Sequence, residues 1–483
     1  MRKATCANDY HGDNVMLFNL LLAIVLLIEF WLCLTKSDFE LLSPAPLNTL
    51  VFCLAAALSI LGMRTWNEVP LKVDGFSFLL LGCTCFALGA LLVRAFWQTR
   101  NPRGRHYARP GSLDSHHTHS FEVASWKYLV LFVVVIAAAA IRIHDMTEMA
   151  AGAGKHFESY VDLAKWARQV TSSSFSTSNI RMGEGFSLVS RQSDKLVTVI
   201  AYCSVFFSVR SIADARGWKG IVPPLSCLLA TCGYTILMGS RGPIANYAFA
   251  SALAFFLLQL RDGRSARLIT KKMITIGGIA VLLGIPLFYF SSALVGRMAS
   301  SSLDSYISFY VSGGLPSFQL ALDRGIAASP YPGMRSFYNL YVFAYKFGII
   351  HSLQPYASDF VRIGNHDSNI YTMFFRYFAD FGIAGIIVLG TAAGGIFEAM
   401  YEYARRHPIP AVVVPFLYVG SNLFDLEREE YVFSRMLNTS VLVIVVLAVI
   451  VTLWLTGSLG TYILQLRRHM RGALRREDAL DDI

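Results

Sequence analysis

The sequence predicts an all-α, polytopic integral membrane protein, and three observations carry this prediction. Apolar residues make up 54% of the chain, whereas charged residues make up only 15%. The mean hydropathy of +0.48 lies above the usual range of soluble proteins. Apolar runs long enough to cross about 30 Å of hydrocarbon recur along the whole chain. Runs this long predict helices, because only a helix satisfies its own backbone groups inside a bilayer.

The apolar runs predict about eleven membrane-spanning helices. The expected spans lie near residues 15–34, 45–63, 76–97, 128–148, 196–212, 221–238, 242–260, 274–292, 379–400, 409–424 and 436–457. The 409–424 run is short and contains Pro410 and Pro415, so we expect a broken or tilted helix there. We expect one polytopic domain over residues 1–483, because no segment outside the runs is long enough for a large separate core.

Clusters of Lys and Arg predict the orientation. If the span count holds, the basic segments 94–127, 261–272, 405–406 and the tail after residue 457 all lie on one side. The positive-inside rule makes this side cytoplasmic and places the C-terminus there. The N-terminus then lies outside, which the basic Arg2 and Lys3 fit poorly. Much of the net charge of +10 lies in these short loops, so it does not indicate a nucleic-acid partner.

Two long segments, residues 149–195 and 293–378, then lie on the outer side. In the first, the apolar positions of residues 157–168 fall at helical spacing, which predicts an amphipathic helix lying on membrane lipids. The second is rich in Tyr and Phe. It is too apolar to be disordered and too interrupted to span, so we expect interfacial or re-entrant helices around a cavity.

Arginines on the outer side predict an anion-binding region. Arg241 lies in the turn Gly239-Ser-Arg-Gly-Pro243 near the start of a helix, and its fork of donors matches phosphate oxygens. The alternative is an arginine that anchors the helix end in the lipid head groups. Residues 293–378 contain one Lys, no Glu and a modest basic surplus. The arginines of this segment are Arg297, Arg324, Arg335, Arg362 and Arg376. We expect some of them to contact substrate and the others to stabilise the loop.

Candidate acid–base residues follow in the same segment. His366, Asp367 and Asp380 could take a proton from an acceptor hydroxyl, as glycosyl transfer requires, beside the polar Asn369 and Tyr371. The structural alternative for Asp380 is a helix cap, or an ion pair with the arginine four residues before it. An acidic turn at residues 425–430 could also supply the base or pair with loop arginines, although a solvated loop end is the more common role.

At these residues the chain resembles the Wzy family of oligosaccharide repeat-unit polymerases, or O-antigen polymerases. The resemblance rests on Ser240-Arg-Gly-Pro243 and on Tyr310 followed by Gly313-Gly314. It rests most on Asn369-Ile-Tyr-Thr372 leading to Asp380-Phe-Gly-Ile-Ala-Gly385. It covers most of the chain from about residue 196 onward, and residues 1–195 match only as a pattern of spans.

The resemblance implies a metal-independent enzyme of the bacterial inner membrane, active at the periplasmic face. Such an enzyme transfers a growing glycan from undecaprenyl diphosphate onto a new lipid-linked repeat unit, and makes O-antigen or exopolysaccharide. The resemblance places Arg241, Arg297 and Arg376 on the diphosphates and implies a chain-length-regulating co-polymerase as partner. We expect no cofactor, because the sequence has no P-loop, no Gly-x-Gly-x-x-Gly and no Asp-x-Asp motif.

Two alternatives stay open. An O-antigen ligase would use the same carrier and similar arginines, but would move finished glycan onto a lipid A core. A polysaccharide or lipid transporter, or a flippase, would place ionisable residues deep within its spans and often shows repeat symmetry. Because the charges of this chain concentrate at predicted helix ends and in the outer loops, the sequence favours the enzyme.

Overall fold

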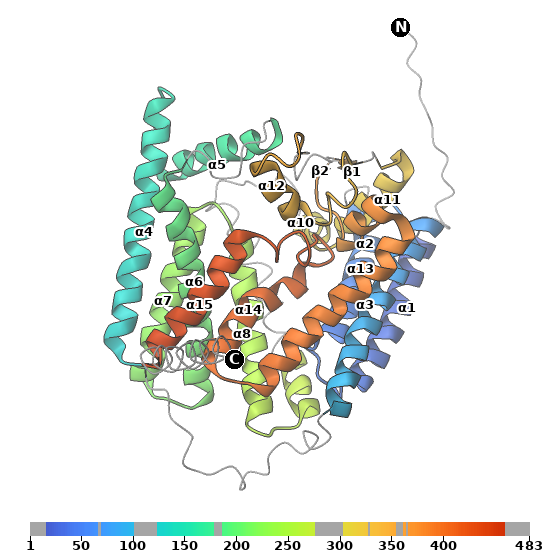
Figure 1. Cartoon of the computed structure of the whole chain (residues 1–483), viewed down its shortest axis with the longest axis horizontal. Helices are drawn as coiled ribbons and strands as arrows, with labels where there is room; N and C mark the ends of the chain where they lie inside the picture. Colours follow the sequence, from blue (N-terminus) through green and yellow to red (C-terminus); the bar gives the residue numbers. More distant parts are fainter. Residues whose placement is uncertain are drawn as a thin grey trace, which may run out of the picture.

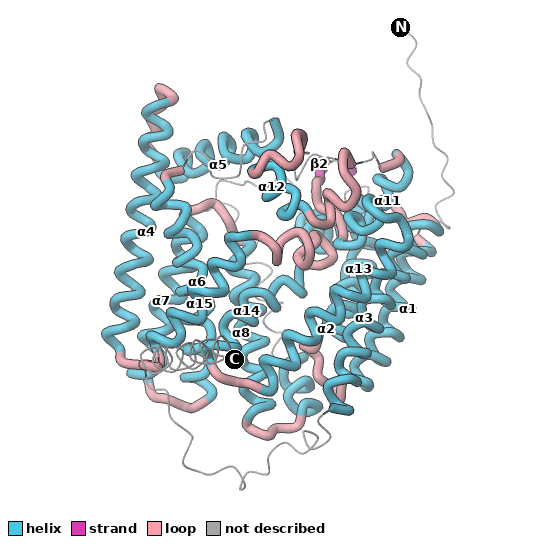
Figure 2. Tube along the Cα trace, in the orientation of Figure 1, coloured by secondary structure: helices cyan, strands magenta, loops and turns pink. Residues whose placement is uncertain are grey.

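The computed structural model describes residues 16–65, 69–100, 123–177, 186–275, 303–326, 329–353, 361–363 and 366–458. The regular structure of these residues is almost entirely helical (Figures 1 and 2). Its one exception is a short antiparallel hairpin of β1 (Val361–Ile363) and β2 (His366–Ser368), in which Arg362 is the backbone partner of Asp367. The all-α fold class is therefore confirmed.

One group of helices consists of α1 (Leu17–Lys36), α2 (Pro44–Thr65), α3 (Val73–Arg100) and α13 (Met373–Arg406), on the right in Figure 1. Among the described helices, α3 and α13 make the most extensive contact. Glycines allow their backbones to approach closely. A Cβ at Gly89 would lie 1.9 Å from the Thr391 carbonyl oxygen, and a Cβ at Gly394 would lie 1.9 Å from that of Phe86.

The second group consists of α4 (Ser125–Gly152), α6 (Leu188–Ala213), α7 (Trp218–Leu237), α8 (Gly242–Arg261), α14 (Pro410–Gly420) and α15 (Thr439–Leu455). Helix α6 lies at its centre and contacts each of the other five. Its most apolar stretch is 78% buried, compared with 28% for α7 and 33% for α4. Helix α6 therefore forms the core of this group, while α4 and α7 expose apolar faces.

Eight described helices are long and apolar enough to cross a membrane, namely α1, α2, α3, α4, α6, α7, α8 and α13. Helix α15 is also apolar but has 17 residues. The 409–424 run is a broken element, because the 11-residue α14 gives way to the 3-10 helix η2 (Ser421–Asp425). The predicted span 274–292 lies almost wholly outside the described residues, so the count of eleven stays a prediction.

Short helices cover one end of the molecule, which we call the upper end from its place in Figure 1. They are α5 (Tyr160–Thr177), α10 (Leu303–Ser312), α11 (Gly314–Arg324) and α12 (Tyr338–Lys346), and the β1–β2 hairpin lies beside them. The two segments predicted to share one side of the membrane, 149–195 and 293–378, thus place their described helices at the same end. With 9 to 11 residues each, α10, α11 and α12 are too short to span a bilayer.

Helix α13 is interrupted at Gly382, whose φ of 61° and ψ of −147° are not helical. Side chains with a Cβ rarely adopt this conformation, so glycine is required at the break. The interruption divides α13 into an upper piece, residues 373–381, and a long piece, residues 383–406. The motif Asp380-Phe-Gly382 therefore marks the joint between the two pieces.

Candidate functional site

Three segments that are far apart in the sequence meet around the start of α13. The backbone N–H of Met373 donates to the Leu426 carbonyl oxygen at 2.9 Å. Gly314, at the start of α11, lies so close to the acidic turn that a Cβ there would be 2.1 Å from the Glu427 carbonyl oxygen. We call the assembly of residues 310–314, 329–337, 369–380 and 425–434 the upper cluster.

Arg376 lies at the centre of the upper cluster and is only 8% exposed. Its Nε donates to the Glu429 carboxylate at 2.9 Å, and its Nη1 reaches the Arg335 carbonyl oxygen at 3.4 Å. The acidic turn therefore pairs with an arginine of the predicted catalytic loop, which is one of the two roles expected for it. A phosphate that bound Arg376 would compete with the Glu429 carboxylate for its Nε donor.

Asp380 holds the segment 329–336 in place. Its Oδ2 accepts from the Ser336 backbone N–H at 2.6 Å, and its Oδ1 accepts from the Ser329 hydroxyl at 3.2 Å. Arg335 Nη1 also donates to the Ser329 hydroxyl, at 3.2 Å. In the structure, the carboxylate four residues after Arg376 thus binds a loop, and the ion pair of Arg376 is made with Glu429 instead.

Glu430 is fully buried and has a structural role. It accepts from the Tyr377 hydroxyl at 2.8 Å and from three successive backbone N–H groups. These amides belong to Val432, Phe433 and Ser434, at 2.7, 2.9 and 2.6 Å. Several N–H donors stabilise a buried carboxylate strongly. Glu430 therefore joins the upper piece of α13 to the chain that leads into α15.

Glu427 is the most isolated carboxyl group of the acidic turn. It is 3% exposed, and its Oε2 has no hydrogen-bond partner among the described residues. Burial, reinforced by the nearby Asp425, raises the pKa of Glu427 well above its ordinary value, and Arg428 opposes this shift. Arg428 in turn pairs with Asp425 at 3.3 Å and lies 5.4 Å from the Tyr310 ring. Burial therefore favours the neutral, protonated form of Glu427 more than it would be favoured in an exposed glutamate.

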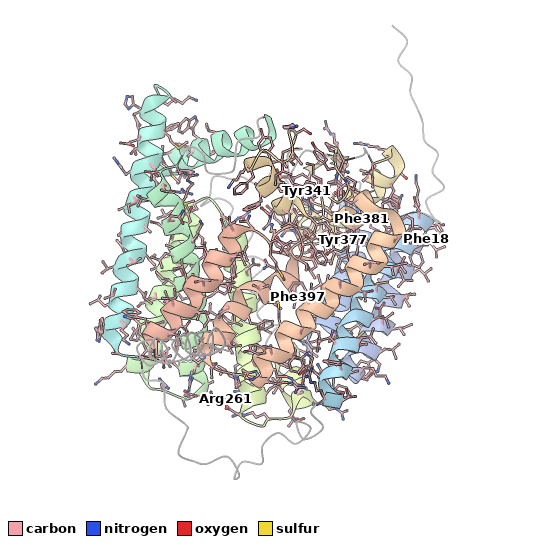
Figure 3. All side chains as sticks on the ribbon, viewed as in Figure 1. Phe18, Arg261, Tyr341, Tyr377, Phe381 and Phe397 are labelled. Atoms are coloured by element: carbon pink, nitrogen blue, oxygen red, sulfur yellow. The ribbon has the colours of Figure 1, made fainter. Side chains whose placement is uncertain are left out.

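Aromatic side chains pack the upper cluster together. Figure 3 shows Tyr341, Tyr377 and Phe381 gathered at the upper end around α12 and the upper piece of α13. The Phe337 ring lies 6.4 Å from that of Phe381 and 5.5 Å from that of Phe433. The polar contacts of the upper cluster are thus surrounded by rings, which lower the local dielectric and strengthen each ion pair.

The other predicted site residues are more scattered. Tyr371 is buried and stacks on Phe375 with ring centroids 4.0 Å apart, whereas Asn369 just before it is exposed. Arg324, at the end of α11, and Arg362, on β1, are exposed at the upper end. Arg297 and the side chains of His366 and Asp367 lie outside what the structure describes.

Arg241 belongs to the second helix group. It is 5% exposed and occupies the N-cap position of α8. Figure 3 shows Arg261, the last residue of α8, at the lower end of the molecule, so α8 begins on the side of the upper end. The arginines that the resemblance assigns to the diphosphates thus come from both helix groups, with Arg241 on α8 and Arg376 on α13.

The charge balance of the upper cluster differs from the expected basic surplus. Residues 293–378 carry more Arg and Lys than Asp. The acidic turn, however, contributes Asp425, Glu427, Glu429 and Glu430 to the same cluster. Sequence position separates these acids from the loop, so their effect could not be read from the loop alone. Among the described residues of segment 293–378, Arg324, Lys346 and Arg362 are exposed.

Buried charges inside the helix groups were missed by the sequence analysis. At the opposite, lower end, Arg94 of α3 contacts Glu40 at 3.1 Å and Glu398 at 3.3 Å. Arg405 bridges Glu40 and Glu402 at 3.0 and 2.8 Å. We call Glu40, Arg94, Glu398, Glu402, Arg405 and Arg406 the lower cluster. Arginines 94, 405 and 406, which the sequence assigned to the cytoplasmic side, are therefore partners of buried glutamates.

A further ion pair joins the buried Arg142 of α4 to the partly exposed Asp194 of α6 at 3.2 Å. Both residues lie within long helices, and Arg142 is buried. The expectation that charges concentrate at helix ends and in loops was thus incomplete, and it carries less weight against a transporter than the sequence suggested. Arg142 inside the apolar run 128–148 was the signal that could have revealed this pair.

No protein-family model, curated protein or solved structure matches this chain. Among the residues that the structure describes, no group of three or more His, Cys, Asp or Glu side chains is placed to hold a metal ion. The chemistry has to be inferred from the upper cluster, which combines buried arginines, a protonatable carboxyl group and an aromatic surround at one end of an apolar helix assembly.

Proposed function

We propose that the protein is a membrane glycosyltransferase that polymerises undecaprenyl-diphosphate-linked repeat units into O-antigen or exopolysaccharide at the periplasmic face of the bacterial inner membrane. One observation carries this proposal. The motifs around Tyr310, Gly314 and Thr372, which underlie the resemblance to polymerases, meet the acidic turn in one cluster at the end of an apolar helix assembly. A substrate with a polyprenyl tail and an anionic head suits this combination of apolar helices and buried arginines.

In the proposed reaction, a hydroxyl of the new repeat unit attacks the anomeric carbon of the growing glycan. The new glycosidic bond forms as the bond between that carbon and the diphosphate oxygen breaks, and undecaprenyl diphosphate leaves with the bonding electrons. Arginines promote this step by stabilising the charge that develops on the leaving group. Arg376 and Arg335 of the upper cluster, with Arg241 of α8, would hold the diphosphates, and Arg297, Arg324 and Arg362 would attract the anionic substrates.

The acceptor proton needs a base. His366, Asp367 and Asp380 were the candidates from the sequence, and the buried Glu427 joins them. Asp380 already accepts two hydrogen bonds from the loop 329–336, which would keep it in place but oppose its use as a base. Positioning of the acceptor and stabilisation of the leaving group would supply the remainder of the rate enhancement.

The proposal is tested by gel analysis of surface glycan from a deletion strain of the host, complemented with wild type, Arg241→Ala or Arg261→Ala. Arg261 provides the matched control, because it is the last residue of the same helix, at the lower end. We expect wild type and Arg261→Ala to restore the glycan ladder and Arg241→Ala to leave a core with a single repeat unit. A normal ladder in the deletion strain would refute O-antigen polymerisation.

The same strains separate the alternatives. Full-length chains that remain on the carrier lipid would indicate a ligase. Transport of glycan or lipid into vesicles by the purified protein, without any glycan transfer, would indicate a transporter or flippase.

A further inference from the structure

A polar network, partly exposed at Asp194, joins three helices of the second group. Arg142 of α4 donates through Nη1 to the Ser190 hydroxyl at 3.0 Å and pairs through Nη2 with Asp194 at 3.2 Å, both on α6. The Tyr234 hydroxyl of α7 donates to the other oxygen of Asp194. The Phe186 ring lies 3.5 Å from the guanidinium carbon of Arg142 and covers it.

This network also fixes the end of α7. Arg142 Nε lies 2.9 Å from the Met238 sulfur, immediately after the last residue of α7. The Tyr160 hydroxyl of α5 donates to the Leu237 carbonyl oxygen at 2.7 Å. The last turn of α7, which carries Tyr234, is therefore held from α4, α5 and α6 at once.

Arg241 follows directly from that turn. The Ser240 N–H donates to the Thr235 carbonyl oxygen at 3.0 Å, and the Gly239 N–H donates to that of Ile236 at 2.8 Å. These bonds tie the residues just before Arg241 to the same last turn of α7. A displacement of Tyr234 would thus be passed on to Arg241 through only a few backbone atoms.

We propose that Arg142, Asp194 and Tyr234 are positioning residues that hold Arg241 in the orientation that binds the diphosphate. They act through the end of α7 and do not touch the substrate. An arginine binds phosphate best when its planar fork is already oriented, because less conformational entropy is then lost on binding. This inference rests on the proposed function, since it assigns Arg241 the anion that the function requires.

The test uses the purified full-length protein in detergent, with undecaprenyl diphosphate as the probe and its Kd as the measurement. Tyr234→Phe removes only the hydroxyl that donates to Asp194. Tyr401→Phe is the matched control, because this buried hydroxyl also donates to a carboxylate, that of Glu40 at 2.9 Å, but in the lower cluster. We expect Tyr234→Phe to raise the Kd at least about threefold, a fraction of the roughly tenfold effect of one hydrogen bond to a charged group, because the effect reaches the probe indirectly, and Tyr401→Phe to leave it unchanged.

A double-mutant cycle separates positioning from a general loss of structure. In an Arg241→Ala background, Tyr234→Phe should cause no further loss of affinity, because its effect passes through the missing arginine. An equal loss in both backgrounds would overturn the inference. Asp194→Glu should retain more affinity than Asp194→Asn, since it keeps the charge that faces Arg142.

The outcomes also distinguish the inference from the function on which it rests. If Arg241→Ala itself binds the probe like wild type, the proposed role of Arg241 is wrong. If Arg241→Ala weakens binding while Tyr234→Phe behaves like Tyr401→Phe, only the positioning role is wrong. Thermal unfolding of each variant confirms that it is folded. If Tyr234→Phe does not fold, it is replaced by Tyr160→Phe, which removes the hydroxyl that donates to the Leu237 carbonyl oxygen and contacts the Met146 sulfur.

Discussion

Replacement of Arg94 by Met should destabilise the protein strongly. Arg94 is only 2% exposed. Its guanidinium contacts Glu40 at 3.1 Å, Glu398 at 3.3 Å and Glu402 at 3.9 Å. Methionine keeps the apolar stem of the side chain but removes the guanidinium and its charge. The three carboxylates would then share only the two remaining arginines of the lower cluster.

Removal of one partner from a buried ion pair typically costs about 3–5 kcal/mol, because the other charge stays buried without compensation. We expect Arg94→Met to lower the free energy of unfolding by this amount, measured on the purified protein in detergent or bicelles. Arg100→Met on the same helix is the control, since Arg100 is exposed and exposed charges contribute about 0–1 kcal/mol. Addition of Glu398→Met to Arg94→Met should recover part of the loss.

If Arg94→Met lowered the free energy of unfolding no more than Arg100→Met, the predicted contribution of the buried guanidinium would be refuted. That result would mean that water reaches the lower cluster and screens its charges, or that Arg405 and Arg406 compensate for the missing guanidinium.

Three further changes test other parts of the structure. Gly382→Ala should cost about 1–3 kcal/mol of unfolding free energy, because alanine is strained at this backbone conformation; Gly233→Ala, a helical site with open space around it, should cost nothing. Glu427 has a raised pKa, so the folded state prefers its neutral form, and wild-type stability should fall as the pH rises above the ordinary value of 4.5. Glu427→Gln should therefore reduce the loss of thermal stability as the pH rises above 4.5, and an unchanged slope would exclude this carboxyl as its source. Glu429→Gln should tighten the binding of inorganic pyrophosphate, measured by calorimetry, because Arg376 loses its competing carboxylate; weaker binding would show that Glu429 is needed to orient Arg376.

The fold class could be predicted from the sequence because a bilayer demands long apolar helices, and such runs are visible in the sequence itself. The same counting of spans predicted that residues 149–195 and 293–378 lie on one side, and their described helices do lie together at the upper end. What could not be predicted was the choice of partners. The spacing of four residues on a helix suggests that Arg376 pairs with Asp380. In the structure, Arg376 instead pairs with Glu429, 53 residues away.

Pairings of this kind are decided by how helices pack. The close approach of α3 and α13 depends on Gly89 and Gly394 lying opposite carbonyl oxygens, and this alignment brings Arg94 to Glu398. The sequence shows the glycines and the charges but not their register. The roles of the acidic turn and of Arg142 depended on the same kind of tertiary information.

The interruption at Gly382 has a mechanical consequence. The long piece of α13 extends about 36 Å at 1.5 Å per residue, so a tilt of about 10° would move its far end by about 6 Å. Membrane helices tilt in this way when the bilayer thickness changes. In a continuous helix the same rotation would pull Arg376 away from Glu429. The break at Gly382 interrupts this continuous helix below Asp380, so a tilt of the long piece need not rotate Arg376 away from Glu429.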